Sequence, residues 1–405
     1  MMKTNAIYCG DCKNVLVNHI PDESIDLIYV DPPFFSNKQY EVIWGDGYEL
    51  RAFEDRWKGG IENYIAWMED KVRECHRVLK STGSMYLHCD YHANAHLRIL
   101  MDEIFGENHF QNEIIWGRHA GFKRSSAKKF PTKNDVILFY TKSKEYYFEP
   151  QYKLHKPEYL KRFKPNKTGR LCRTDVNPTK GGRRTIYLDE VKGDLIDNIW
   201  NDINPINPMA KERLGYPTQK PESLLERIIK ASSKPTDTVL DPMCGCGTAI
   251  SVAHKLGRQW IGVDVSPSAC KLMVKRMRKL GVSISEKDII GLPRTLDEIK
   301  NLQPFEFQNW VCQKLLARVS QKKSGDMGID GWTIDGRPLQ VKQSEHIGRN
   351  PIDNFETAIR RMKKTRGIFV AFSFGKGAYE EVARVHLEEG LEIELKTVEE
   401  IMKEI

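Results

Sequence analysis

The segment "SIDLIYVDPPF" at residues 24–34 ends a hydrophobic run on a carboxylate, two prolines and an aromatic ring. In an open α/β sheet, ligands bind beyond the carboxyl ends of the strands, and Asp31 is expected at such an end. Pro32 and Pro33 fix φ and donate no hydrogen bond, so the loop is stiff and offers carbonyl acceptors. Phe34 adds a face on which a planar ring can stack. This combination suits the exocyclic amine of a heterocyclic base.

These groups predict a particular chemistry at that amine. Its lone pair is delocalised into the ring, and acceptors on its hydrogens free the lone pair for attack. An enzyme that does this to duplex DNA must first flip the base out of the helix. A strand that ends in a proline turn capped by Asp31, with no chemical role, is the structural alternative.

A second candidate site is the glycine turn in "LDPMCGCGTAISVAHKLG", between a predicted strand and a predicted helix. Gly245 and Gly247 let backbone N–H groups approach a ligand at the helix N-terminus. Asp264 ends the next predicted strand, where a carboxylate can accept hydrogen bonds from ribose hydroxyls. A nucleoside-containing cofactor is therefore expected. NAD is one candidate, although Ile250 replaces the third glycine of GxGxxG.

A third group lies in "KKSGDMGIDGWTIDGRPLQVKQS", with Asp330 on one predicted strand and Gln340 and Lys342 on the next. Residues two apart on a strand share a face. An acid, an amide oxygen and an ammonium group converging there can bind Mg²⁺ through Asp330 and Gln340 and orient a water against a phosphodiester. An exposed polar strand face fits the same pattern.

The elements that must position these groups fall into two patterns. Strand-like and helical runs alternate through residues 1–116, which favours βα units and a mainly parallel sheet. The alternation breaks between about 117 and 207 and resumes through residue 292. After a predicted linker at 293–303, a new order of helices and strands begins and fills 304–405. Two α/β domains are expected.

The net charge of +8 comes from one segment. Residues 118–184 hold 19 Lys and Arg against 5 Asp and Glu, which gives +14, so the rest of the chain carries −6. Ten Phe and Tyr residues between 122 and 163 are interspersed with these cations. Cations for phosphates and rings for bases favour a nucleic-acid surface over a merely solvated face.

Other features set limits on the class of protein. No apolar stretch reaches ~18 residues, and no signal-peptide core is present, which favours a cytoplasmic protein without a membrane partner. Nine scattered cysteines suit reduced thiols, and buried thiols are favoured over a zinc site formed by Cys9, Cys12, Cys244 and Cys246. For His88, His92 and His96, packing and polar capping are favoured over metal binding.

In their order along the chain, these motifs resemble the β class of DNA amino-methyltransferases, which use S-adenosylmethionine. The matching segments are "YCGDCKNVL", "SIDLIYVDPPF", "GSMYLHCD", "DEIFGENHFQNEIIW", "PTQKP", "DPMCGCGTA" and "WIGVDVSP". The resemblance implies a Rossmann-like, circularly permuted methyltransferase domain at 1–292 with a target-recognition insert at about 117–207. It implies a catalytic loop of Asp31, Pro32, Pro33 and Phe34, and a cofactor site of Asp11, Lys220, Asp241, Gly245, Gly247 and Asp264.

The chain departs from the usual pattern of this class in its glycine loop and in its catalytic loop. Met243 and Cys246 replace the Phe and Ser that are usual in the glycine loop, which changes its packing. Phe34 replaces the commoner Tyr and loses a hydroxyl. Asp31 stands where the cytosine-N4 branch often has Ser, so the resemblance favours adenine N6 and leaves cytosine N4 as the alternative.

With "PFEFQNWVCQKLLARV" before it and "RGIFVAFSF" after it, the third group resembles the Mrr-like branch of the PD-(D/E)xK nucleases. The resemblance implies a restriction-endonuclease-like domain in which Asp330, Gln340 and Lys342 are catalytic and Glu306 is a helper. The amide oxygen of Gln340 binds a cation less strongly than a carboxylate would, so a domain that only binds DNA or a partner is the alternative.

Taken together, the sequence predicts a single-chain restriction–modification protein that methylates adenine N6 in double-stranded DNA and cuts DNA with Mg²⁺. A homodimer is expected if both strands are cut. An NAD-linked oxidoreductase is disfavoured by Ile250 and by the basic segment.

Overall fold

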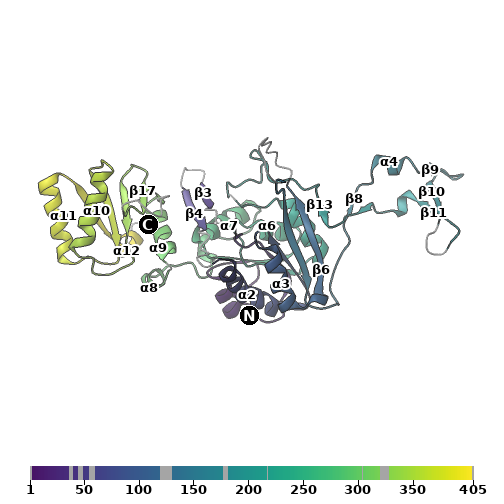
Figure 1. The fold of residues 1–405 in the computed structure, drawn as a ribbon, viewed down its shortest axis with the longest axis horizontal. Coiled ribbons are helices and arrows are strands. Elements are labelled where there is room, and N and C mark those ends of the chain that lie inside the picture. Colours follow the sequence, from purple (N-terminus) through teal and green to yellow (C-terminus); the bar gives the residue numbers. More distant parts are fainter. Residues whose placement is uncertain are drawn as a thin grey trace.

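The structure is a computed structural model that describes residues 2–35, 40–43, 49–53, 60–118, 130–176, 181–216, 218–302, 304–319 and 328–403 of the 405-residue chain. Two α/β parts follow one another along the sequence, and each is built on its own sheet (Figure 1). Within the described ranges, no helix is both long and apolar enough to cross a membrane.

An eight-stranded sheet forms the first part, in the order β1-β15-β14-β2-β5-β7-β6-β13. Its strands are β1 (Ala6–Cys9), β2 (Ile25–Val30), β5 (Leu79–Cys89), β6 (Phe110–Gly117), β7 (Asn134–Thr141), β13 (Ile199–Trp200), β14 (Thr238–Asp241) and β15 (Gln259–Asp264). Neighbours from β1 to β5 in this order are parallel, whereas β7 runs antiparallel to both β5 and β6. The mainly parallel α/β sheet that the sequence predicts is confirmed.

Helices cover both faces of this sheet, because each helix presents an apolar side to it. The helices on one face are α1 (Cys12–His19), α2 (Gly60–Val78) and α3 (Asn94–Phe105), and those on the other are α5 (Glu222–Ser232), α6 (Thr248–Lys255) and α7 (Pro267–Lys279). The fully buried side chains of α5 include Leu224, Leu225, Ile228 and Ile229. Burying each of them contributes about 1.5–3 kcal/mol.

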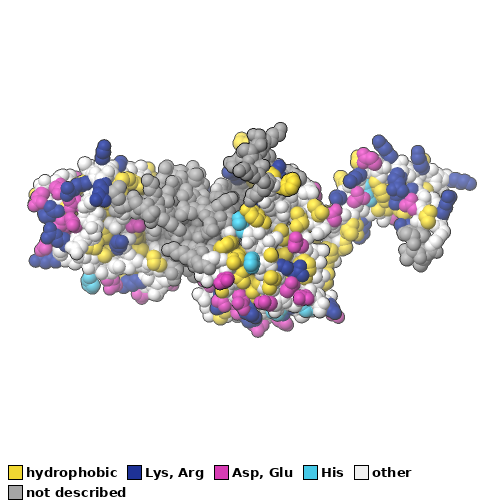
Figure 2. All heavy atoms as spheres, viewed as in Figure 1, with side chains coloured by type: hydrophobic (Ala, Val, Ile, Leu, Met, Phe, Trp, Pro, Cys, Tyr) yellow, Lys and Arg dark blue, Asp and Glu magenta, His cyan; other side chains and the backbone are white. Residues whose placement is uncertain are grey.

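The predicted insert at about 117–207 contributes both to the main sheet and to a projecting arm. β7 and β13 lie within the predicted insert at about 117–207, yet β7 pairs with β5 and β6, and β13 pairs with β6. The arm, at the right of Figures 1 and 2, carries many Lys and Arg side chains on its surface. Its elements are β8 (Tyr152–Lys153), α4 (Pro157–Leu160), β9 (Lys164–Pro165), β10 (Leu171–Val176), β11 (Arg183–Tyr187) and β12 (Asp194–Leu195).

The second part contains a five-stranded sheet in the order β16-β17-β18-β19-β20. Its strands are β16 (Ala317–Val319), β17 (Gly331–Thr333), β18 (Pro338–Val341), β19 (Arg366–Ala371) and β20 (Glu392–Thr397). Its helices are α9 (Pro304–Lys314), α10 (Arg349–Arg361), α11 (Lys376–Glu389) and α12 (Val398–Lys403), and α8 (Leu296–Lys300) precedes them. α9 and α12 contribute to one apolar core and α10 and α11 to another. A hairpin of β3 (Tyr40–Ile43) and β4 (Glu49–Phe53) forms a further small sheet.

Candidate active site

The strand order gathers polar residues from distant parts of the sequence at one edge of the main sheet. Asp31 follows the end of β2, Asp241 ends the neighbouring strand β14, and Asp264 ends β15. Because β7 runs antiparallel to β5, its first residues lie at the same edge, which adds Asp135 to the group. This is the edge at which ligands bind in open α/β sheets.

A cavity of about 780 Å³ opens at this edge, within the range of ~300–1,000 Å³ that is usual for small-molecule sites. The predicted site residues that line it are Asp31, Pro32, Pro33, Phe34, Lys220, Asp241 and Gly245. Among the described residues, Asp11, Gly247 and Asp264 do not line it. The structure therefore brings the proline corner, Lys220 and the start of the glycine turn around one space.

The two oxygens of the Asp31 carboxylate have different surroundings. Lys220, which is 189 residues away in the sequence, donates a hydrogen bond from Nζ to Oδ2. The same Nζ lies 5.1 Å from the centroid of the Phe34 ring. Oδ1 is buried and has no hydrogen-bond partner in the described part of the chain. Because an unpaired buried acceptor costs about 1–3 kcal/mol, Oδ1 is well suited to accept from an N–H group of a ligand.

The turn between β14 and α6 has a backbone that favours glycine. Gly245 and Gly247 have φ values of +53° and +78°. A Cβ atom on Gly245 would lie 3.1 Å from Tyr216 Cε1, so the Tyr216 ring packs directly on this turn. The Tyr216 hydroxyl is buried without a hydrogen-bond partner among the residues that the structure describes. The glycine turn allows a ligand to come close to the backbone, and the Tyr216 hydroxyl beside the same cavity is unpaired within the described residues. Both features suit a nucleoside-type cofactor.

Asp264 holds the glycine turn in place. Its Oδ2 accepts a hydrogen bond from Gly245 N and its Oδ1 accepts one from Ser266 N, each 2.8 Å long. Burial raises the pKa of Asp264 to about 6, and these two hydrogen bonds oppose the rise. The sequence predicts a ribose acceptor at this position, whereas in the structure both oxygens already bind backbone amides.

Asp241 and Asp11, the other predicted acids, differ in their environment. Asp241 is buried at the cavity wall, and its burial raises its pKa well above the usual value. The hydrogen bond from Met243 N, 3.2 Å long, opposes this rise, and the charge of Asp31 adds to it. Asp11 caps α1 by accepting from Asn14 N at 3.2 Å, and its Oδ2 lies 3.6 Å from Lys71 Nζ.

Sequence reasoning missed Arg276, which supports the glycine turn from α7. Its buried guanidinium donates hydrogen bonds to Cys246 O at 3.2 Å, to Thr248 Oγ1 at 3.0 Å and to Glu222 Oε1 at 3.0 Å. Arg276 therefore connects the turn to the start of α5, directly after the "PTQKP" motif. A cation among the apolar positions of α7 is the only local signal, because its partners lie 28 to 54 residues away.

The histidines and cysteines occupy separate environments. His88 is fully buried on β5, His92 Nδ1 lies 2.7 Å from Asp90 Oδ2 ahead of α3, and His96 is exposed on α3. Cys12 belongs to the core on one face of the main sheet, whereas Cys9 and Cys244 belong to the core on the other. The four thiols of the alternative zinc site therefore do not converge.

In the second sheet, Asp330 and Gln340 lie on neighbouring chain segments. Asp330 precedes β17, and its Oδ2 accepts a hydrogen bond of 2.7 Å from Val341 N on β18. The Gln340 side chain is buried, and its Oε1 has no hydrogen-bond partner among the groups that the structure describes. Lys342 follows β18 and is exposed. The side chain of Glu306, the predicted helper, lies outside the described residues.

Comparison with known proteins matches both parts of the chain. Residues 25–275 match the family model for N6/N4 methylases, described as "DNA methylase", and residues 299–404 match the Mrr-type model described as "Restriction endonuclease". Type II methyltransferase M.BglII of Bacillus subtilis is 32% identical over 319 residues, which cover 76% of this chain and 75% of that protein. DNA adenine methyltransferase YhdJ of Escherichia coli (strain K12) is 29% identical over 258 residues, which cover 64% and 78%.

A similar solved structure is the cytosine-N4-specific PvuII DNA methyltransferase, with a TM-score of 0.46 and 17% identity over 71% of this chain and 90% of that one. The family match spans well over half of this chain and includes the proline corner and the glycine turn. The chain belongs to the N6/N4 family of DNA methyltransferases and carries an Mrr-type restriction-endonuclease domain after the methyltransferase part.

Proposed function

We propose that this protein transfers a methyl group from S-adenosylmethionine to N6 of adenine within a specific DNA sequence. The observation that carries the proposal is the Asp31 carboxylate, with one oxygen bonded to Lys220 and the other buried at a cavity without a described partner. Asp31 at this position also favours adenine over cytosine, by the resemblance described above. The cofactor would bind beside Gly245, Tyr216 and Asp241, which line the same cavity.

In the proposed reaction, Asp31 Oδ1 and the carbonyl of Pro32 accept hydrogen bonds from the amine of the flipped adenine. Phe34 stacks on the base, and Lys220 fixes the carboxylate through Oδ2. S-adenosylmethionine supplies a methyl group on a positively charged sulfur. The bond between N6 and the methyl carbon would form as the carbon–sulfur bond breaks and S-adenosylhomocysteine leaves, and Asp31 would accept the proton that N6 gives up. Such a positioned charge typically contributes 10²–10³-fold to the rate.

The test is Asp31→Ala, with Glu107→Ala as a matched control, because Glu107 is an exposed acid outside the cavity. Asp31→Ala should lower methyl incorporation by on the order of 10³-fold and leave S-adenosylmethionine binding within a few-fold of wild type. Base-resolved sequencing of host DNA reports the modified base and the recognition sequence together. Full activity of Asp31→Ala would refute the assignment, and modified cytosine would replace adenine N6 by cytosine N4.

The basic arm is the proposed DNA-recognition surface. In it, Arg170 lies over the Tyr187 ring at 3.9 Å, and Arg173 lies over the Tyr159 ring at 4.6 Å. Both cations are also paired with acids of the arm, Arg170 with Asp189 and Arg173 with Asp175, so they hold the rings in place. The other, exposed cations of the arm are the groups proposed to bind phosphates. The DNA association constant should fall steeply as the salt concentration rises. Arg162→Ala, which removes a partly exposed arm cation, should reduce the slope of log K against log salt concentration by about one.

For the second part, we propose Mg²⁺-dependent cutting of unmodified DNA. Asp330 and Gln340 would bind the ion and Lys342 would orient the attacking water or stabilise the phosphate. The unpaired, buried Gln340 Oε1 supports a ligand at this position. Lys342→Ala should abolish Mg²⁺-dependent cleavage, with Lys363→Ala, an exposed lysine just after α10, as the control. If wild type binds DNA but never cuts it, the domain acts only in binding.

A homodimer is proposed as well, because both strands would have to be cut. Sedimentation of the protein in the presence of DNA, which reports the mass of the complex, tests it.

A further inference from the structure

A hydrogen-bonded chain of buried side chains lies beneath the catalytic corner. Tyr29 on β2 bonds through its hydroxyl to His88 Nδ1 on β5 at 2.9 Å, and His88 Nε2 lies 3.3 Å from Asp135 Oδ2 on β7. Arg118 Nη2 lies 3.0 Å from the other oxygen of Asp135. Tyr29, His88 and Asp135 are at most 2% exposed, whereas the side chain of Arg118 is 39% exposed. Three of the four residues, Tyr29, Asp135 and Arg118, also line the cavity.

Burial and nearby charges set the protonation of the two groups on either side of His88, Tyr29 and Asp135. Burial, with the charges of Asp31 and Asp241, raises the pKa of Tyr29 well above its usual value, so Tyr29 keeps its proton. Burial alone would raise the pKa of Asp135, but the hydrogen bond to His88 and the nearby cations hold it below its usual value. Asp135 is therefore an ionised acceptor for His88 Nε2–H, and in the Nε2–H tautomer of the ring Nδ1 accepts from the Tyr29 hydroxyl. One tautomer satisfies both bonds, and the ring cannot rotate without breaking them.

His88 is the point at which this chain meets the catalytic loop. Its ring centroid lies 5.7 Å from that of Phe34 and 5.8 Å from that of Trp116, which meets it edge-on. Tyr29 is two residues before Asp31 and also lines the cavity. The position of the His88 ring therefore limits the positions that Phe34 can adopt.

We propose that the Asp135–His88–Tyr29 chain is a positioning device that holds Phe34 and Asp31 in the geometry required by the target base. The inference rests on the proposed methyl transfer and goes beyond it, because none of the three residues is assigned a chemical step. The net contribution of these hydrogen bonds to the free energy of folding is expected to be small. Their main effect is to restrict the orientation of the His88 ring. A misplacement of about 1 Å at a reacting centre can cost on the order of 10²-fold in rate.

The test is a double-mutant cycle of Tyr29→Phe and Asp135→Asn on the full-length protein. The two side chains bind opposite nitrogens of one ring, so each substitution should release the same ring. Each single variant should lower the single-turnover methylation rate about tenfold, and the double variant should fall no more than about twentyfold. S-adenosylmethionine dissociation constants, measured by calorimetry, should stay within about twofold of wild type.

Tyr86→Phe is the matched control. Tyr86 is buried on the same strand as His88, and its hydroxyl bonds to Ser232 Oγ at 2.7 Å away from the cavity. Like Tyr29→Phe, this variant removes one buried phenolic hydroxyl, at a similar cost to the free energy of unfolding. It should leave the methylation rate unchanged. His88→Gln, which can still donate toward Asp135, should retain more activity than His88→Leu, which can only pack.

The outcomes separate this inference from the proposed function. If wild type methylates DNA and both single variants do so at the wild-type rate, the positioning role is refuted and the function stands. An approximately hundredfold loss in the double variant would also refute it, because the residues would then act independently. Equal losses in Tyr86→Phe and Tyr29→Phe would show a general effect of stability and refute it as well. If wild type binds S-adenosylmethionine but methylates no DNA, the proposed function itself fails.

Discussion

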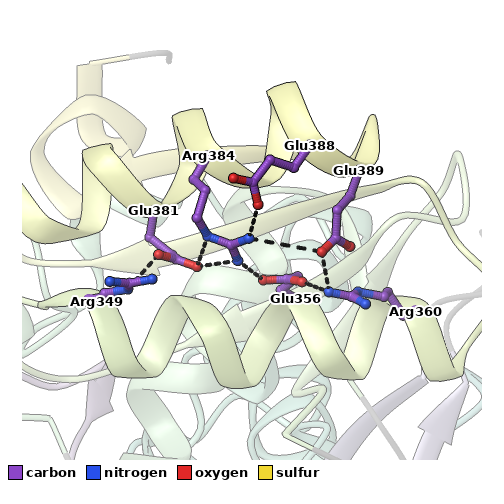
Figure 3. A network of polar contacts seen from close by, with 7 residues as sticks. All are labelled: Arg349, Glu356, Arg360, Glu381, Arg384, Glu388 and Glu389. Atoms are coloured by element: carbon purple, nitrogen blue, oxygen red, sulfur yellow. Dashed lines mark hydrogen bonds and ion pairs between the residues drawn. The ribbon is translucent and has the colours of Figure 1, made fainter.

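The cleft of the main sheet and the helix pair α10–α11 both bury carboxylates, but they satisfy them differently. In the cleft, Asp31 keeps a buried oxygen without a partner in the described part of the chain. Between α10 and α11, both oxygens of Glu356 and both of Glu381 are paired with arginines (Figure 3).

Arg384 lies at the centre of this network. It donates to Glu356 at 3.1 Å, to Glu381 at 2.6 Å and to Glu388 at 2.6 Å. Arg360 bridges Glu356 and Glu389, and Arg349 binds the second oxygen of Glu381. The residues in Figure 3 are Arg349, Glu356, Arg360, Glu381, Arg384, Glu388 and Glu389.

The difference teaches that carboxylate clustering alone does not indicate a ligand site. Asp353, Glu356 and Glu381 place oxygens within 4.8 Å of one another, a spacing that could hold a metal ion. Arginines already neutralise two of these three acids, so the cluster serves to join two helices. The unpaired oxygen of Asp31 has no such function in folding, and its cost to stability of about 1–3 kcal/mol is consistent with a group kept for a ligand.

The largest expected contrast between the two regions is in their response to pH. Burial raises the pKa of Asp264 to about 6, whereas the hydrogen bond from Arg384 lowers the pKa of Glu381 below its usual value. Asp264 ionises near ~3.9 in the unfolded chain, so its contribution to stability is lost as the pH rises through about 6, by on the order of 3 kcal/mol. The contribution of Glu381 is lost in the opposite direction, as the pH falls through its lowered pKa.

Urea unfolding of wild type, Asp264→Asn and Glu381→Gln between about pH 3.5 and 7.5 checks both signs. The free energy of unfolding of wild type relative to Asp264→Asn should fall across this range, and relative to Glu381→Gln it should rise. A wild-type advantage over Asp264→Asn that is independent of pH would contradict the assigned environment of Asp264.

A second contrast concerns position within the ion-pair network. Glu356→Gln should lower the free energy of unfolding of the second part by about 1–3 kcal/mol, because it weakens two charge-assisted bonds at a buried site. Glu388→Gln, which removes an exposed partner of the same Arg384, should cost less than about 0.5 kcal/mol. Thermal unfolding of both variants makes the comparison. Similar losses of stability in the two variants would mean that burial of the carboxylate does not decide how much its ion pair contributes to the free energy of unfolding.

The smallest effect is expected at Tyr216, whose hydroxyl is buried but unpaired within the described ranges. Tyr216→Phe should leave the ligand-free protein equally stable or up to about 1 kcal/mol more stable, because it removes an unsatisfied polar group. It should also weaken S-adenosylmethionine binding by up to about fivefold, measured by calorimetry. A clear loss of stability without ligand would show that the hydroxyl already has a structural partner.

Local sequence patterns predicted most of the fold and part of the site. The apolar spacing of α5 and the alternation of strands and helices predicted the parallel sheet, and the proline corner and Gly245 do line one cavity. The partners of Asp264 were not predictable, since its carboxylate could equally have faced the cavity. Tyr29 and Asp135 gave no local signal, and Arg276 gave only a cation among the apolar positions of α7, because a buried polar residue is recognised mainly through what it contacts.

The sequence by itself determined the types of chemistry available: a stiff acceptor corner, a glycine turn, a basic segment and their order along the chain. Only the tertiary structure decided that Lys220 meets Asp31, that His88 lies behind Phe34, and that Asp264 binds backbone amides. The physical reason is range. Backbone preferences and apolar periodicity act over a few residues, whereas contacts across 189 residues depend on which strands become neighbours in the sheet.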